Sequence, residues 1–413
     1  MSEYTDAVLV QLLQAFHRMA PGDLPNVLRR HYRALGVRKV TVYLVDVQQT
    51  VLVSIPENES DPGRRLDVNN TLAGWAFRSL SMRVEESETG GIELWMPLLD
   101  GVERVGVLGV QVDELNARVL NRCRALSSLI ALALIAKGTF SDSFAHLQRT
   151  SPMQLPAEMV WAFTPQRAIG SGLATSTAVL EPAYDLGGDA YDHSLVDDTL
   201  HTTIVDAMGH DLAAGLTSAV AIAGCRNARR SRNADLADIV TSIETHLDRY
   251  FPDHFVTGIF THLDLTTGRL SWVNCGHPPP LLLRGPDVVP GALEREPELP
   301  LGLGQNGLDS PRAIHHAQLE PGDRVLLYTD GVTDARSANG ERFGEERFTD
   351  FITRAVAAGE PTPETLRRLI HAILRYQHGA LADDAAILLF EWHPFSAIGS
   401  GSVLRDPVGS PTD

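Results

Sequence analysis

The chain has 413 residues, more than a single hydrophobic core usually organises, so the length predicts two folded domains. Its composition is typical of a soluble globular protein, with 44% hydrophobic and 21% charged residues. The formal net charge is −17, from 35 Lys and Arg against 52 Asp and Glu, and no basic run offsets it. Because this charge repels phosphate backbones and anionic lipid heads, the composition argues against a nucleic-acid partner.

Cysteine usage and hydropathy indicate a cytoplasmic protein without a membrane segment. The three cysteines have neither metal nor disulfide spacing, which suits a reducing compartment. The longest apolar stretch, residues 125–136, is about 12 residues long, well under the ~20 that span a bilayer. Arg122 and Arg124 precede it, so we expect a packed helix there. The N-terminus has neither the basic start nor the cleavage site of a signal peptide.

The first half reads as a small α/β domain, residues 1–138. Apolar spacing and turn signals predict, in chain order, helices over 4–35 interrupted by the turn 21–23, strands at 39–47 and 51–55, a helix at 72–80, strands at 93–99 and 103–112, and a helix from about 114 to 138. Asp100-Gly101 is a hairpin signal between the last two strands.

This order of elements resembles a GAF domain, and the segments LAGWAFRSLSMRV and LWMPLLDGVERVGVLGVQV carry the resemblance. The resemblance implies a sensor or dimerisation domain, hence a homodimer built on this half and the neck helices that follow it. GAF domains bind an unknown small ligand in some proteins and act as dimerisation spacers in others. No set of His, Cys or Asp residues in this half indicates which ligand would bind, and both interpretations, ligand binding and dimerisation, stay open.

The polar stretch 139–158 predicts a helical neck or linker, and residues 393–413, rich in Gly, Ser and Pro, predict a disordered tail. Between them, residues 159–392 form the second domain. Its predicted strands lie at 200–207, 255–265, 269–276, 324–330 and 385–392, and its predicted helices at 212–229, 236–251, 348–358 and 363–376. Thr266-Thr267-Gly268 predicts a hairpin between two of these strands.

Aspartates recur where the apolar strands of this second domain end. Asp206 closes one strand, Asp330 follows another, and Asp383 and Asp384 precede a third. Asp189 lies in AYDLGGDAYD, where carboxylates crowd around a glycine pair that lets the backbone bend. Taken singly, an Asp is more often a turn residue or helix cap than a ligand. Brought together, such carboxylates make a site for hard divalent cations, Mg²⁺ or Mn²⁺, and disfavour zinc.

Five ordered motifs, LGGDAYD, VDAMGHD, NCGHPPPLLL, LLYTDGVTDARSANGERFG and ADDAAILL, resemble the metal-dependent PPM serine/threonine phosphatases of the bacterial SpoIIE branch. The resemblance implies an α+β, four-layer (α-β-β-α) sandwich of antiparallel sheets with two Mn²⁺ or Mg²⁺ ions at one edge. It also implies a catalytic or metal-binding role for each of several residues. Asp206 would bridge both metals, and the carbonyl of Ala207 would reach one of them. Asp330 and Asp383 would bind the first metal, and Asp189 would hold waters of the second. Asp384 is an adjacent polar position that could exchange roles with Asp383.

Other polar residues of these motifs are less well supported as metal ligands or catalytic groups. For Asp185 and Asp192 we expect capping or solvated roles, and for Asp211 a helix cap. His277 is expected to fix its loop through backbone hydrogen bonds, and His210 is balanced between such a role and catalysis. His315 and His316 are expected to face solvent. Asp334 stands where the branch usually has Glu, and no residue is identified as the phosphate clamp.

The resemblance implies that the substrate is a phosphoserine or phosphothreonine on an anti-sigma-factor antagonist, a small STAS protein, whose dephosphorylation frees a sigma factor for transcription. One alternative is a catalytically degenerate scaffold that binds a phosphoprotein without cleaving it. A second is another metal-dependent hydrolase reaction, such as nucleotide cleavage, for which no P-loop, GGDEF or HD-type motif is present.

Overall fold

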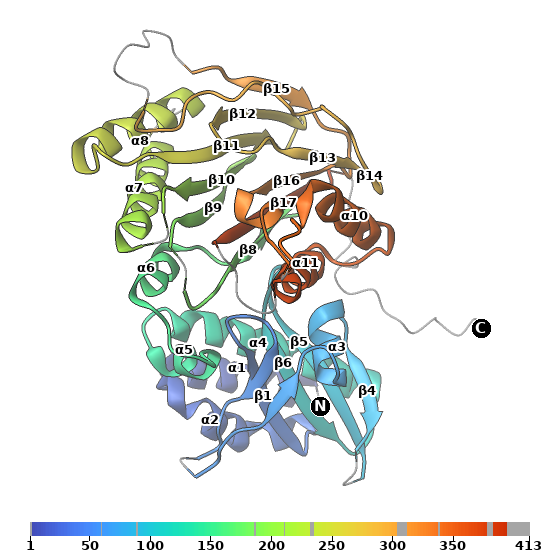
Figure 1. Ribbon diagram of the computed structural model, residues 1–413. Coiled ribbons are helices and arrows are strands. Elements are labelled where there is room, and N and C mark those ends of the chain that lie inside the picture. Colours follow the sequence, from blue (N-terminus) through green and yellow to red (C-terminus); the bar gives the residue numbers. More distant parts are fainter. Residues whose placement is uncertain are drawn as a thin grey trace. The chain divides into compact units, whose positions relative to one another are not determined.

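The computed structural model describes residues 2–58, 60–87, 90–185, 187–209, 211–231, 235–303, 312–337, 339–377 and 383–394. The chain divides into two compact units whose border lies at Ser151 and Pro152 (Figure 1). The predicted tail from 395 onward lies outside the described residues. The predicted neck, 139–158, contains one short helix of the first unit and the start of the first helix of the second.

The N-terminal unit is one antiparallel sheet with helices on both faces. Its sheet order is β3-β2-β1-β6-β5-β4. The strands are β1 Lys39–Val45, β2 Val51–Ser54, β3 Arg65–Asp67, β4 Arg83–Glu86, β5 Ile92–Asp100 and β6 Glu103–Val112. The helices are α1 Ser2–Arg18, α2 Leu24–His31, α3 Leu72–Ser79, α4 Ala117–Gly138 and α5 Asp142–Gln148, with 3-10 turns at Pro21–Asp23 and Tyr32–Leu35. The edge strands β3 and β4 were not expected from the sequence, because runs of three and four residues are too short to show alternation.

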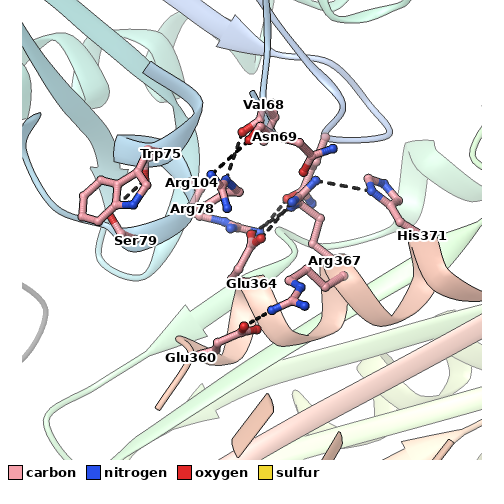
Figure 2. A network of polar contacts seen from close by, with 12 residues as sticks. Val68, Asn69, Trp75, Arg78, Ser79, Arg104, Glu360, Glu364, Arg367 and His371 are labelled. Atoms are coloured by element: carbon pink, nitrogen blue, oxygen red, sulfur yellow. Dashed lines mark hydrogen bonds and ion pairs between the residues drawn. The ribbon is translucent and has the colours of Figure 1, made fainter. Parts of the chain in front are cut away.

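Two apolar clusters hold this unit together. On one face of the sheet, α1, α2, α4 and α5 pack on Val42, Leu94 and Leu108 among others. On the other face, Phe77 of α3 packs against Trp95. Arg78 of α3 donates to the carbonyls of Val68 at 3.0 Å and Asn69 at 3.2 Å, which ties the helix to the loop before it (Figure 2).

Helix α4 contains the long apolar stretch of the sequence. By length and composition it is the one helix among the described residues that would suffice to cross a membrane, with a mean hydropathy of 1.5 in its best window. Its residues Cys123, Leu126, Ile130 and Leu134 are buried in the core of the unit. The packed helix expected from the sequence is therefore present.

The C-terminal unit is a sandwich of two antiparallel sheets. One sheet has the order β15-β12-β11-β10-β9 and the other β14-β13-β16-β17-β8-β7. The first comprises β9 Asp189–Val196, β10 Thr199–Ala207, β11 Val256–Asp264, β12 Arg269–Cys275 and β15 His315–Gln318. The second comprises β7 Ala168–Gly170, β8 Ala174–Glu181, β13 Leu281–Arg284, β14 Asp287–Val288, β16 Arg324–Tyr328 and β17 Ala385–Trp392.

Helices cover both outer faces of the sandwich, giving the expected α-β-β-α layers. They are α6 Leu155–Phe163, α7 Leu212–Arg229, α8 Leu236–Tyr250, α9 Asp330–Thr333, α10 Gly344–Ala357 and α11 Thr362–Tyr376. Helices α7 and α8 pack on the five-stranded sheet, and α9, α10 and α11 pack on the six-stranded sheet (Figure 1). The inner core lies between the sheets, where Ile204, Trp272 and Leu388 are fully buried.

Helix α11 also contains a buried ion pair. Arg367 donates from both Nε and Nη2 to the carboxylate of Glu364, each at 2.8 Å, and from Nη1 to Nδ1 of His371 at 3.3 Å (Figure 2). A bidentate guanidinium–carboxylate pair of this kind satisfies both charges.

Candidate metal centre

Asp189 and Asp206 lie side by side at one edge of the five-stranded sheet. Strand β9 begins at Asp189 and β10 ends at Ala207, and the antiparallel register pairs Asp206 directly with Asp189. Asp189 is only 2% exposed, and Asp206 is half-buried. Directly opposed carboxylates on adjacent strands repel each other, so this pairing needs a compensating charge.

Asp330, Asp383 and Asp384 lie at the matching edge of the six-stranded sheet. Strand β16 ends at Tyr328, two residues before Asp330, and β17 begins at Ala385, next to Asp384. A Cβ atom on Gly331 would lie 1.7 Å from the backbone oxygen of Asp384. Only glycine therefore allows the start of α9 to pack against the Asp383–Asp384 segment.

Asp384 joins the two sheets at this edge. Its Oδ2 accepts hydrogen bonds from the backbone N–H groups of Gly187 at 2.7 Å, Gly188 at 2.6 Å and Asp189 at 3.3 Å. Asp383 is exposed, and its Oδ1 accepts from the backbone N–H of Asp384 at 3.0 Å. The buried Asp384 carboxylate thus holds the glycine turn in place, whereas the Asp383 carboxylate lies toward solvent.

Thr329 makes a second connection between the sheets. Its hydroxyl donates to Oδ2 of Asp189 at 2.6 Å, and it accepts from the backbone N–H of Ala386 at 2.9 Å. Thr329 could not be identified from the sequence, because a threonine before an aspartate has no distinctive pattern. Its role depends on a partner 140 residues away.

The Ala207 carbonyl lies beside the same glycine turn. A Cβ atom on Gly188 would lie 2.4 Å from the backbone oxygen of Ala207, which explains why glycine is needed here. The backbone N–H of Ala207 donates to the Gly188 carbonyl at 3.2 Å, and the hydroxyl of Ser218 on α7 donates to the same carbonyl. Ser218 is a second supporting residue that the sequence did not reveal.

The carboxylates at this edge raise one another's pKa values. Burial, then the charges of Asp206 and Asp384, raise the pKa of Asp189 well above its ordinary value. Burial and the neighbouring carboxylates, Asp330 first among them, raise the pKa of Asp206 to about 7. Burial and Asp383 raise the pKa of Asp330 in the same way. A divalent cation would relieve this repulsion, so the donor set, all carboxylate and carbonyl oxygen, fits a hard cation.

The acidic edge is nevertheless open rather than preassembled. Within the described ranges, no three His, Cys, Asp or Glu side chains converge tightly enough to hold an ion as they stand. The carboxylates of Asp189, Asp206, Asp330, Asp383 and Asp384, here called the acidic edge, lie at the same edge of the sandwich and influence one another electrostatically. To bind a cation, they would have to move closer together.

Asp192 corrects one expectation. It was expected to cap or to be solvated, but it is 1% exposed and accepts ion-pair contacts from Arg226 at 2.6 Å and Arg229 at 2.8 Å. Alternation along β9 turns its side chain toward α7, which carries both arginines. Asp185 is exposed, in agreement with the solvated role expected of it.

The histidines of the sequence motifs lie at different positions in the fold and do not form one site among the described residues. The ring of His277 is buried and hydrogen-bonds through Nδ1 to the hydroxyl of Thr257 at 2.8 Å, and the backbone of His277 hydrogen-bonds to the side chain of Asn274. Thr257 pairs with Asp206 in the sheet, so His277 supports the strand beside the acidic edge. His316 is exposed and His315 half-buried on β15, where they form no ligand pair. His210 lies outside the described residues.

Two further motif residues have clear contacts. Asp211 caps α7 by accepting from the backbone N–H of Ala214 at 3.0 Å, which confirms the expected cap. Asp334 forms an ion pair with Arg342 at 3.1 Å. In these two interactions, neither side chain contacts a carboxylate of the acidic edge.

Two antiparallel sheets face to face, helices outside both, and carboxylates from both sheets at one edge together define the PPM, or PP2C-type, phosphatase fold. The family model described as Stage II sporulation protein E (SpoIIE) matches residues 196–393. Residues 196–393, just under half of the chain, are therefore similar to the SpoIIE family of phosphatase domains. The match contains Asp206, Asp330, Asp383 and Asp384, and begins after Asp189.

Curated relatives match over the same half. The chain is 26% identical to Protein IcfG of Synechocystis over 209 residues, which cover 44% of this chain and 32% of that protein. It is 25% identical to the phosphoserine phosphatase RsbP of Bacillus subtilis over 156 residues, 36% of this chain and 37% of RsbP. It is 23% identical to the phosphoserine phosphatase RsbU of Bacillus subtilis over 217 residues, 51% of this chain and 61% of RsbU. The chain thus spans about a third of the first two proteins and less than two thirds of the third.

Among solved structures, the chain is similar to the SiaA-PP2C domain of Pseudomonas aeruginosa, with a TM-score of 0.46 and 21% identity over 52% of this chain and 85% of that one. It is also similar to the catalytic domain of the serine/threonine phosphatase PstP in complex with two manganese ions, with a TM-score of 0.37 and 18% identity over 54% of this chain and 99% of that one. Because both TM-scores are below 0.5, the similarity of residues 196–393 to the SpoIIE family rests on the sequence match.

Proposed function

We propose that the chain is a metal-dependent protein serine/threonine phosphatase that hydrolyses a phosphoserine or phosphothreonine. The observation that carries the proposal is that Asp189 and Asp206 from one sheet share an edge with Asp330 and Asp383 from the other, in a field that raises the pKa values of Asp189, Asp206 and Asp330. Crowded carboxylates of this kind are costly without a cation.

The proposed roles follow from these positions. Asp206 would hold both ions with the help of the Ala207 carbonyl, Asp330 and Asp383 would hold the first ion, and Asp189 would orient waters around the second. We assign Asp384 a positioning role, because its buried carboxylate already accepts three backbone hydrogen bonds. When bound, two Mn²⁺ or Mg²⁺ ions supply an activated water and offset the negative charge that develops on the phosphoryl oxygens.

The chain's own residues keep this arrangement in place. Thr329 fixes the Asp189 carboxylate by a hydrogen bond, so its free oxygen has a defined direction. The glycine turn, held by Asp384, brings backbone close to the Ala207 carbonyl. These contacts fix the Asp189 carboxylate and the glycine turn, around which the other oxygen ligands would close, and no protein nucleophile is needed.

The proposed substrate is an anti-sigma-factor antagonist of the STAS type, so that activity would regulate sigma-factor-dependent transcription in the cytoplasm. We further propose that the N-terminal unit is a GAF-like sensor or dimerisation domain that regulates the phosphatase through residues 139–158. The antiparallel sheet with the central pair β1 and β6 supports the GAF-like interpretation. The side of the sheet under α3 is filled by Tyr43, Phe77 and Trp95, which favours dimerisation over ligand binding. A monomeric mass in light scattering would contradict the proposed homodimer.

The test is hydrolysis of p-nitrophenyl phosphate by the full chain with Mn²⁺ and with EDTA. We expect metal-dependent turnover, its abolition in Asp330→Asn, and its retention in Asp185→Asn. Asp185 is the matched control because it is an exposed carboxylate of the same acidic stretch. Full activity of Asp330→Asn would refute the proposed site. Metal binding without turnover by the wild-type chain would favour the alternative of a phosphoprotein-binding scaffold.

A further inference from the structure

A groove of about 790 Å³ is lined by α10 on one side and by the β13–β14 hairpin and the chain that follows it on the other. Its hairpin side is apolar and includes Leu281, Val288, Val289 and Pro290. Prolines in this wall restrict the backbone, so the groove is a preformed surface rather than a loose loop. Apolar walls of this kind bind aliphatic side chains.

Carboxylates rim the groove from both sides. Glu345, Glu346 and Asp350 come from α10, and Asp287 and Glu294 come from the hairpin side. All five are exposed. Within the described part of the chain, the one ion pair that any of them forms joins Asp350 to Arg354, at 2.9 Å. Arg354 lines the groove as well, so Asp350 is compensated while the other four carboxylates leave the groove with net negative charge beside its apolar wall.

Helix stabilisation explains only part of this acidity. Glu345 and Glu346 occupy the first turn of α10, where negative charge complements the helix dipole. Asp287 and Glu294 face them from a strand and a loop, where no dipole argument applies. The position of the acidic residues on both walls of the groove is therefore not explained by stabilisation of the α10 N-terminus alone.

The groove is also next to the strand and helix that carry Asp330. The ring of Phe348 on α10 packs on that of Tyr328, with centroids 4.9 Å apart. The backbone N–H of Phe343 donates to the carbonyl of Ala335 at 2.6 Å, which links the start of α10 to the end of the Asp330 segment. Leu281 pairs with Leu326 on β16, the strand that leads to Asp330.

We propose that this groove binds a segment of the phosphoprotein substrate that carries lysine or arginine together with aliphatic residues, close in sequence to the phosphorylated residue. The inference rests on the proposed function, because it assigns the groove to the substrate of the neighbouring acidic edge. Basic side chains match the four carboxylates that form no ion pair among the described residues, and aliphatic side chains match the apolar wall. The groove thereby sets which phosphoproteins are cleaved, while the acidic edge does the chemistry.

The first experiment measures binding by fluorescence anisotropy. The probes are three labelled peptides of equal length in which leucines alternate with lysine, glutamine or glutamate. We expect the lysine peptide to bind the full chain about tenfold more tightly than the glutamate peptide, with the difference shrinking at high salt. Equal binding of the lysine and glutamate peptides would overturn the proposal.

The variant Glu345→Lys/Glu346→Lys should abolish or reverse the preference, with an unchanged thermal melt showing that it folds. The control Asp198→Lys/Asp248→Lys makes the same change in net charge at exposed positions outside the groove and should keep the preference. A preference that survives in the first variant, or disappears in both, would overturn the proposal.

The second experiment uses the same peptides with a central phosphoserine. We expect a lower KM for the lysine peptide than for the glutamate peptide, and equal KM values would overturn the assignment of the groove to the substrate. Absence of any turnover of p-nitrophenyl phosphate with Mn²⁺ would overturn the proposed phosphatase instead. The two failures are distinguishable, because the anisotropy measurement needs no catalysis.

Discussion

Asp206→Asn should make the metal-free protein more stable while it destroys the metal site. Asparagine has nearly the same shape as aspartate but has no charge to repel Asp189, Asp330 and Asp383. The ordinary pKa of an aspartate is 3.8, and that of Asp206 is raised to about 7. A carboxyl group with a raised pKa destabilises the folded state once the pH passes its unfolded value, and the penalty is complete above its folded value.

The magnitude follows from the size of this shift. About three pKa units correspond to about 4 kcal/mol at pH 8, and screening of a half-buried group reduces this to about 2 kcal/mol. For a unit of this size, that is a rise of about 4 to 8 °C in the melting temperature. The gain should shrink toward pH 5, where the wild-type carboxyl group is already protonated in the folded state.

The assay is thermal denaturation of the full chain at pH 8 in EDTA and in Mn²⁺. We expect Mn²⁺ to stabilise the wild-type protein and to leave Asp206→Asn unchanged. Asp192→Asn is the matched control, because it is the same substitution at a buried aspartate that is paired with Arg226 and Arg229; it should destabilise the protein. A less stable Asp206→Asn in EDTA at pH 8 would refute the electrostatic reasoning.

Three further predictions concern the same edge. The stabilisation by Mn²⁺ should be larger at pH 8 than at pH 5, since raised pKa values make protons compete with the metal at low pH; thermal shifts across this range check it, and a larger effect at pH 5 would contradict it. Thr329→Val removes the hydrogen bonds to Asp189 and Ala386 and should cost about 1 to 3 kcal/mol in urea unfolding, whereas Thr329→Ser should lose much less; equal losses would count against the bridge. Gly331→Ala places a Cβ atom against the Asp384 carbonyl and should weaken Mn²⁺ binding measured by calorimetry, while Gly172→Ala, with open space around it and no positive φ, should not.

Much of the secondary structure was predictable because its signals are local. The sequence predicted α7 at 212–229 and β17 at 385–392, and the structure has both with the same bounds. Capping of α7 by Asp211 was equally visible, since the capping carboxylate and the donor N–H of Ala214 lie three residues apart. Strands such as β8 and β9 were missed, because the mixed pattern of β9, with Asp189, Asp192 and His193 inside it, contradicts the usual composition of a strand.

What the sequence determined by itself is the inventory: carboxylates at the ends of apolar strands, glycines where the chain must turn, and helices with one apolar face. These features depend on neighbours a few residues away, which periodicity and turn chemistry report. Only the tertiary structure decided what each acid does. Asp384 holds the Gly187–Gly188 turn and Asp192 pairs with two arginines of α7, although both are aspartates in acidic motifs. Their partners lie 34 to 197 residues away, and such contacts are set by sheet register and layer packing, which leave no local pattern in the chain.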